Sequence, residues 1–179
     1  MKIEKIHHVA YRCRDAKETV EFYKNVLNMD LIGAIAEDRV PSTKAPDPYM
    51  HIFIDAGAGN ILAFFELPNS PPMGVDPNTP SWTQHIAFQV ASVEELNEAR
   101  DRAVAAGLDV VGPTDHNIFK SIYFHDPSGH RLEVATWTTT PEKNKKMGDV
   151  AHAMVEEWAR TKQPPRHTAW LHEAEFSNH

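Results

Sequence analysis

The chain has 179 residues, of which 41% are hydrophobic and 24% charged, as is typical of one globular domain. Its formal net charge of −7 and its lack of a Lys/Arg-rich block argue against nucleic acid as a partner. No apolar run is long enough for a membrane span, the first 20 residues hold no signal-peptide core, and the single Cys13 excludes an internal disulfide. We therefore expect a cytoplasmic protein without a membrane partner.

The chain carries one pattern of elements twice. The first copy predicts a strand, a helix and three further strands at residues 8–13, 16–27, 29–33, 52–55 and 61–66. The second copy predicts the same five elements at residues 85–90, 93–106, 108–112, 122–125 and 131–133. A repeat in so short a chain indicates two copies of one βαβββ unit that pack around a joint core. The predicted fold class is therefore α+β.

The two modules, residues 4–67 and 81–137, are joined by a Pro-rich linker over 68–80, and together they form one predicted domain over residues 1–140. The linker prolines suit a loop, because Pro has no N–H to donate to a strand ladder.

Two further segments fall outside the repeated elements. Pro41, Pro46 and Pro48 predict a loop between two strands of the first module, because proline has no N–H to donate to a strand ladder. After residue 140 the repeat ends, and the extension 141–179 begins with helical composition. This helix could dock on the core, act as a lid or form a dimer contact.

Alternation along the strands predicts which side chains share a face. His8 and Arg12 lie on one face of the first strand, and His85 lies on the matching face of its repeat. The last strands are expected to add further side chains to these faces, namely Leu62, Phe64, Glu66 and Glu133. If the modules join side by side, the faces away from the helices form one curved trough.

Two imidazoles and a carboxylate that converge on one trough suit a divalent metal and leave positions open for substrate or oxygen. We expect His8, His85 and Glu133 to be the ligands, with Glu66 as a further candidate. Imidazole and carboxylate ligands are compatible with iron, nickel, zinc, cobalt or manganese.

Four segments together resemble the vicinal oxygen chelate superfamily, which includes glyoxalase I, extradiol ring-cleaving dioxygenases and fosfomycin-resistance proteins. They are HVA at 8–10, FYKNVL at 22–27, HIAF at 85–88 and YFHDPSGHRLE at 123–133. The resemblance covers residues 4–137. It implies paired βαβββ modules around a metal trough, a small-molecule substrate and a homodimer.

Within this superfamily, the favoured interpretation is an extradiol-type dioxygenase that cleaves a catechol-like aromatic with Fe(II) and O2. The resemblance implies that Tyr123, ten residues before Glu133, bonds a substrate oxygen, with His116 as its assisting group. An aromatic pocket wall is expected from Phe53, Phe64, Trp82 and Trp137. The position of the family's acid–base histidine holds Asn60 or Ile61, and His51 is a possible substitute.

Two alternatives remain open. A glyoxalase-like lyase or isomerase would use four ligands, His8, Glu66, His85 and Glu133, one of the glutamates would act as the base, and Arg12 would bind the thiol substrate. A non-catalytic, resistance-type protein would only sequester a ligand in the trough.

Overall fold

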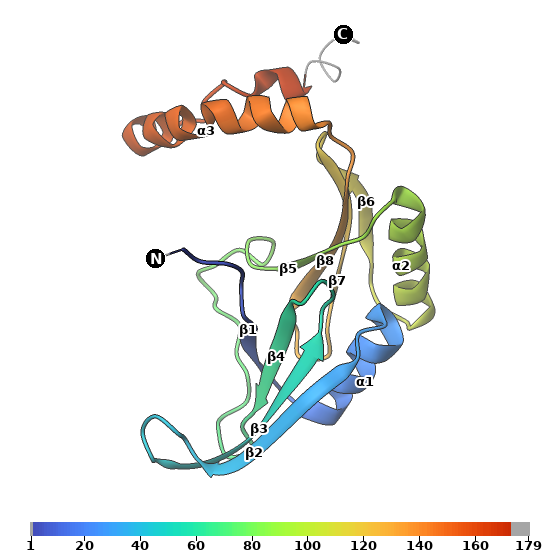
Figure 1. Ribbon diagram of the computed structural model, residues 1–179, viewed down its shortest axis with the longest axis vertical. Coiled ribbons are helices and arrows are strands. Elements are labelled where there is room, and N and C mark those ends of the chain that lie inside the picture. Colours follow the sequence, from blue (N-terminus) through green and yellow to red (C-terminus); the bar gives the residue numbers. More distant parts are fainter. Residues whose placement is uncertain (1, 173–179) are drawn as a thin grey trace.

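The computed structural model describes residues 2–172 and confirms the α+β class and the repeat (Figure 1). Sheet A holds the first four strands in the order β1-β4-β3-β2: β1 Val9–Cys13, β2 Leu31–Arg39, β3 Pro46–Asp55 and β4 Ile61–Glu66. Sheet B repeats this as β5-β8-β7-β6: β5 Ile86–Gln89, β6 Val111–Asp115, β7 Phe119–His125 and β8 Arg131–Trp137. In each module the first strand in the chain pairs parallel to the fourth, β1 with β4 and β5 with β8. A helix connects the first strand of each module to the second.

One helix covers each sheet, and its ends follow from local side-chain chemistry. Asp15 caps α1, Ala16–Leu27, by accepting a hydrogen bond from Glu18 N at 2.8 Å, and Ser92 caps α2, Val93–Ala105, in the same way. Asn28 ends α1 in the left-handed conformation, with a φ of 57°. The two helices lie next to each other on one side of both sheets (Figure 1).

A single hydrophobic core joins the two modules, as the repeat predicts. It lies between the helices and the sheets and includes Tyr23, Phe64, Leu96, Phe124 and Val134, each at most 1% exposed. These core residues come from both halves of the chain.

The prediction of a loop at Pro46 and Pro48 is wrong, because both residues lie in β3. The β2–β3 hairpin extends beyond β4, whose pairing with β3 begins only at Met50. The first residues of β3 therefore have one unpaired edge, where the missing N–H of proline is tolerated.

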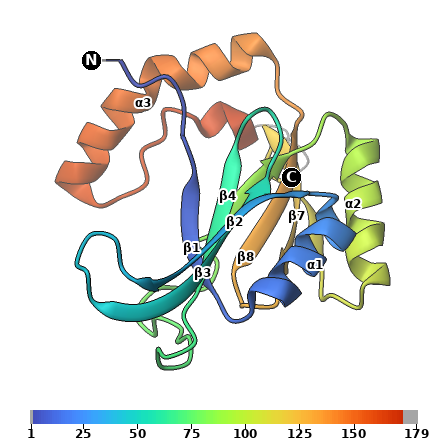
Figure 2. The same cartoon turned by 60° about the horizontal axis from the view of Figure 1, so that its bottom comes forward.

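The C-terminal extension forms α3, Pro141–Thr161, and a short 3-10 helix, Ala169–His172, that folds back beside it (Figure 2). Lys146 Nζ stacks over the Trp170 ring at 4.1 Å. No side chain of α3 is buried, so docking on the core, one of the three options for this helix, is not observed. Residues 173–179 of the predicted extension lie outside the described part. Within the described residues, no helix is long and apolar enough to cross a membrane.

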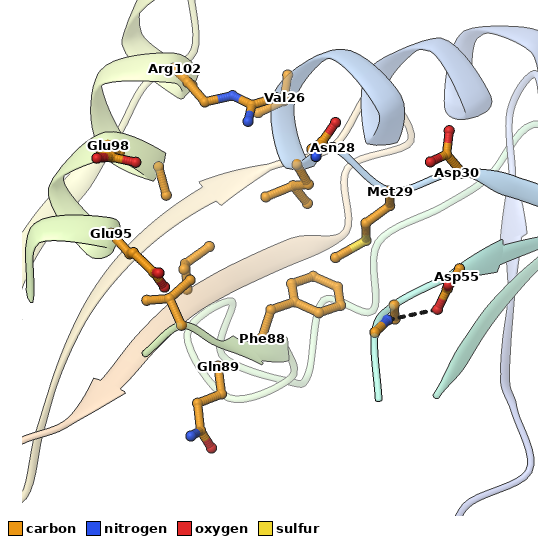
Figure 3. Close-up of a pocket in the computed structure, with 16 residues that line it drawn as sticks. Val26, Asn28, Met29, Asp30, Asp55, Phe88, Gln89, Glu95, Glu98 and Arg102 are labelled. Atoms are coloured by element: carbon orange, nitrogen blue, oxygen red, sulfur yellow. Dashed lines mark hydrogen bonds between the residues drawn. The ribbon is translucent and has the colours of Figure 1, made fainter. Parts of the chain in front are cut away.

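A cavity of about 510 Å³ lies between the modules on their helical side (Figure 3). Met29 and Phe88 line its apolar floor, and carboxylates such as Glu95 and Glu98 stand at its rim. None of the predicted metal ligands lines this cavity. It belongs to the junction of the modules rather than to the predicted site.

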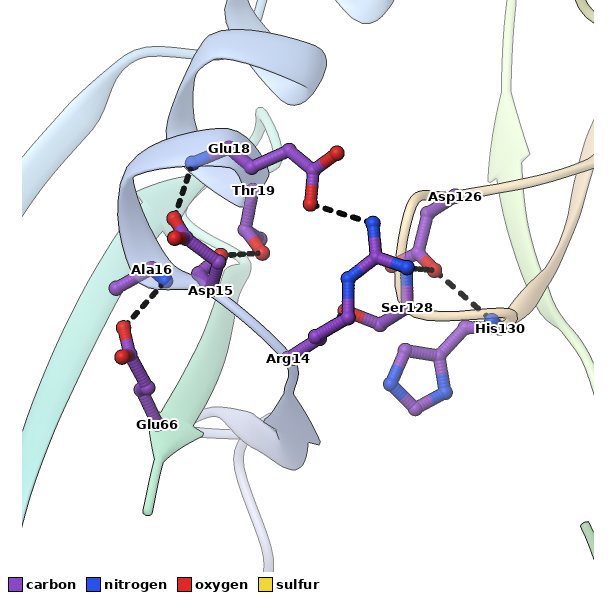
Figure 4. A network of polar contacts seen from close by, with 9 residues as sticks. All are labelled: Arg14, Asp15, Ala16, Glu18, Thr19, Glu66, Asp126, Ser128 and His130. Atoms are coloured by element: carbon purple, nitrogen blue, oxygen red, sulfur yellow. Dashed lines mark hydrogen bonds and ion pairs between the residues drawn. The ribbon is translucent and has the colours of Figure 1, made fainter. Parts of the chain in front are cut away.

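The turn between β7 and β8 fastens the second module to the first (Figure 4). Ser128 Oγ accepts a hydrogen bond from Arg14 N at 3.0 Å, and Asp126 accepts one from the buried Tyr23 hydroxyl at 3.2 Å. His130 Nε2 donates to the Arg12 carbonyl at 2.7 Å. Because each contact joins residues more than 100 positions apart, this clamp (Arg12, Arg14, Tyr23, Asp126, Ser128 and His130) sets the relative position of the modules.

Candidate metal and catalytic site

A continuous chain of polar contacts lies on the face of sheet B that is turned away from the helices. Glu133 Oε2 lies 2.9 Å from His85 Nε2, and Glu133 Oε1 accepts a hydrogen bond from the Tyr123 hydroxyl at 2.9 Å. His116 Nε2 lies 3.0 Å from the Tyr123 oxygen and 3.1 Å from Ser121 Oγ. The structure thus brings together four residues that the sequence singles out: His85, His116, Tyr123 and Glu133.

Strand register explains this arrangement. Glu133 on β8 pairs with Tyr123 on β7 and with Ala87 on β5, so the three side chains point to one face. Leu132 and Val134, the neighbours of Glu133, point to the other face and are buried in the core. Alternation along β8 therefore decides which carboxylate reaches the site.

The site keeps its carboxylate away from water. The Glu133 side chain is only 4% exposed, whereas 31% of the His85 side chain reaches solvent. Burial raises the pKa of Tyr123 above its ordinary value, and the hydrogen bond to Glu133 acts in the same direction. The Arg131 guanidinium, 4.2 Å above the Tyr123 ring, opposes this rise. The Tyr123 hydroxyl therefore keeps its proton and acts as a hydrogen-bond donor.

His8 stands apart from this cluster. It is exposed at the start of β1, where its Nδ1 lies 2.8 Å from His7 Nδ1. Its other ring neighbours are His51 and Phe53, with centroids at 6.5 and 6.4 Å. Among residues 2–172, no three His, Cys, Asp or Glu side chains form a group that could hold a metal. One chain alone does not bring His8 to His85 and Glu133.

The predicted placement of Leu62, Phe64 and Glu66 on the trough face is wrong, and Leu62 is buried in the core. Phe64 is fully buried in the core on the helical side, so it has no surface to offer a substrate. Glu66 shares that side, where its Oε2 accepts a hydrogen bond from Ala16 N at 2.7 Å and so caps α1 (Figure 4). The error came from matching the two glutamates by sequence. By register, Ala10 pairs with Ala63 as Ala87 pairs with Glu133, so Ala63 is the counterpart of Glu133.

The other predicted substrate residues are partly available. Arg12 lies on β1, where its Nη2 donates to the Pro71 carbonyl at 2.7 Å and so holds the linker. Phe53 is half-buried beside His51, with ring centroids 4.2 Å apart. Trp137 is 53% exposed and packs edge-on against Phe119.

Two residues near the site escaped the sequence analysis. Buried Ser121 contacts His116, and His7 contacts His8. Period-two alternation from Tyr123 would have found Ser121. Alternation from Glu133 also places Arg131 on this face, where it stacks on Tyr123. His7 precedes β1, so alternation gives no signal there.

The donor set at Glu133 fits a divalent metal. His85 Nε2 and Glu133 Oε2 lie 2.9 Å apart on the same face of sheet B. An imidazole nitrogen and a carboxylate oxygen are also ligands that iron, zinc and manganese accept.

Comparisons with known proteins agree with this architecture. Residues 5–134 match the family described as the Glyoxalase/Bleomycin resistance protein/Dioxygenase superfamily. MhqA of Bacillus subtilis (strain 168), assigned by its name to the ring-cleaving dioxygenases, is 28% identical over 144 residues, which are 72% of this chain but only 42% of MhqA. The metallothiol transferase FosB of Lysinibacillus sphaericus is 26% identical over 147 residues, covering 77% of this chain and 86% of FosB.

Solved structures show the same fold. A mutant of the FosX fosfomycin-resistance protein from Listeria monocytogenes, in complex with Mn(II), matches with a TM-score of 0.56 and 24% identity, over 81% of this chain and 100% of FosX. Glyoxalase I of Leishmania major matches with a TM-score of 0.57 and 17% identity, over 88% of this chain and 99% of that enzyme.

Proposed function

Because the chain belongs to the Glyoxalase/Bleomycin resistance protein/Dioxygenase superfamily, we propose that it is a metal-dependent ring-cleaving dioxygenase. In this proposal His8, His85 and Glu133 hold Fe(II), and the substrate is a small catechol-like aromatic that reacts with O2. The observation that carries it is the contact chain from His85 through Glu133 and Tyr123 to His116.

The number of carboxylates separates this proposal from the glyoxalase-like alternative. A four-ligand site needs a second carboxylate in the position that corresponds to Glu133 in sheet A. Ala63 occupies that position, and Glu66 is bonded to the start of α1 on the opposite side. Two histidines and one carboxylate form the ligand set of non-haem iron oxygenases, with positions left for substrate and oxygen.

When bound, the metal would supply open coordination positions for the substrate oxygens and O2. The chain's own residues would orient the substrate and move its proton. The Tyr123 hydroxyl, which donates to Glu133 Oε1 in the free chain, would donate to a substrate oxygen in the complex. His116 Nε2, 3.0 Å from the Tyr123 oxygen, is the nearest group that can exchange a proton with it.

The surroundings of the site favour an aromatic substrate. Phe119 stacks on His116, Trp137 packs edge-on against Phe119, and Phe53 lies beside His8. Arg12 is engaged by the linker. The similarity to MhqA supports the same substrate class, although this chain spans less than half of that protein.

We further propose that the site forms between two copies of the chain. The clamp holds each chain's modules in a position in which His8 reaches neither His85 nor Glu133. A partner copy can supply His8 from its own first module, which would give a homodimer with two sites.

The test begins with protein purified without oxygen or chelator. We expect about one iron per chain after loading with Fe(II), and O2 uptake with unsubstituted or alkylated catechols in an oxygen electrode. Iron-loaded protein that takes up no O2 with any catechol would contradict the proposal. Thiol consumption with an electrophile by the Mn(II)-loaded protein would instead support the reaction class of FosB.

A further inference from the structure

We propose that His7 is a positioning residue for His8. In this arrangement His7 Nδ1 accepts the Nδ1 proton of His8 and so leaves His8 Nε2 to bind the metal. The two Nδ1 atoms lie 2.8 Å apart, and the rings meet edge to face at 77°. The inference rests on the proposed function, because it takes His8 as a ligand.

Only one proton fits between two ring nitrogens at this distance. If His7 donated it, neutral His8 would carry its own proton on Nε2 and could not bind a metal there. If His8 donates it, His8 Nε2 keeps a free lone pair. A metal on His8 therefore requires His8 as the donor and His7 as the acceptor.

Among the ring neighbours of His8, His7 is the one within hydrogen-bond distance of its Nδ1. His51 and Phe53 approach His8 with ring centroids more than 6 Å away, and neither makes a hydrogen bond with it. A histidine that binds a metal usually donates the N–H of its other ring nitrogen to an acceptor, which sets both the tautomer and the ring orientation.

Local backbone structure explains how two adjacent side chains meet. In a regular strand, consecutive side chains point to opposite faces. Strand β1 begins at Val9, so residues 7 and 8 precede the pairing that would impose this alternation. The His7 side chain can therefore turn back onto His8.

Metal affinity tests the proposal, with Co(II) as the probe in competition with a chromophoric chelator. His7→Phe removes the acceptor and is expected to weaken Co(II) binding about 10- to 100-fold. His7→Asn places an amide oxygen where Nδ1 stood and is expected to retain wild-type affinity. His152→Phe, an exposed histidine replaced on α3, is the matched control and should leave Co(II) binding unchanged.

A second readout needs no metal. Long-range nitrogen–proton NMR of the apoprotein should place the proton of neutral His8 on Nδ1, and His7→Phe should shift it toward Nε2 while His7→Asn retains it. Unchanged Co(II) affinity and an unchanged His8 tautomer in His7→Phe would overturn the role of His7. His8→Ala separates the two proposals: if it leaves Co(II) affinity intact, the ligand set itself is wrong, and the role of His7 fails with it.

Discussion

The two glutamates of the predicted site allow a matched comparison, because Glu66→Gln and Glu133→Gln make the same chemical change on opposite sides of the sheets. Glu66 caps α1 through Ala16 N at 2.7 Å, and glutamine keeps the acceptor but loses the charge. A carboxylate at a helix N-terminus contributes about 0.3–1 kcal/mol. For a chain of this size, that loss corresponds to a fall in Tm of roughly 1–4 °C.

For metal content, we expect Glu133→Gln to have the large effect and Glu66→Gln to have none. Glu66→Gln should retain about one metal per chain, because its side chain lies on the helical side. Glu133→Gln should lose most of the metal, because it removes the charged ligand beside His85. Elemental analysis and calorimetry of both variants make the comparison. Metal loss in Glu66→Gln, with metal retained in Glu133→Gln, would refute the register argument and favour a different ligand set.

Three further predictions concern catalysis, assembly and pH. Tyr123→Phe should keep its metal and lower kcat for O2 uptake by about 10²- to 10⁴-fold, and an unchanged kcat would remove the hydroxyl from the mechanism. Mixed dimers of His8→Ala and Glu133→Gln chains, isolated with two affinity tags, should regain one metal per dimer because one site is intact, whereas a site within one chain would regain none. Burial raises the pKa of Asp126, so the folded state binds its proton more tightly than the unfolded state does. The stability from this proton is present below about pH 4, the ordinary range of aspartate, and is lost as pH rises through the folded pKa. Urea unfolding of the apoprotein should therefore show Asp126→Asn gaining stability relative to wild type from pH 4 upward, and a relative loss would contradict this.

Much of the fold could be predicted from the sequence, because local sequence patterns specify where the helices and strands form. The helix predicted at residues 16–27 forms over those residues, since Asp15 and Asn28 mark its ends by capping chemistry. The repeat correctly predicted two βαβββ units, because a self-similar pattern implies self-similar structure. The placement of Pro46 and Pro48 failed because tolerance of proline depends on which strand edge is free, which is a property of the assembled sheet.

The sequence allowed us to anticipate the contacts among His85, Glu133, Tyr123 and His116. They follow from alternation along the strands of one sheet and from the spacing of Tyr123 and Glu133 in the segment 123–133. The position of Glu66 could not be anticipated. A three-residue offset between the copies separates Glu66 from the true counterpart of Glu133, and only strand register reveals it.

By itself, the sequence determined the repeated elements and the shared core, because hydrophobic periodicity and capping act over a few neighbouring residues. Tertiary structure alone decided which face each carboxylate occupies and how the two modules are held. The clamp joins the modules through contacts that span more than 100 positions, and among residues 2–172 His8 forms no metal-holding group with His85 and Glu133. Contacts between residues so far apart leave no local pattern in the sequence, so they are visible only once the sheets and helices have packed together.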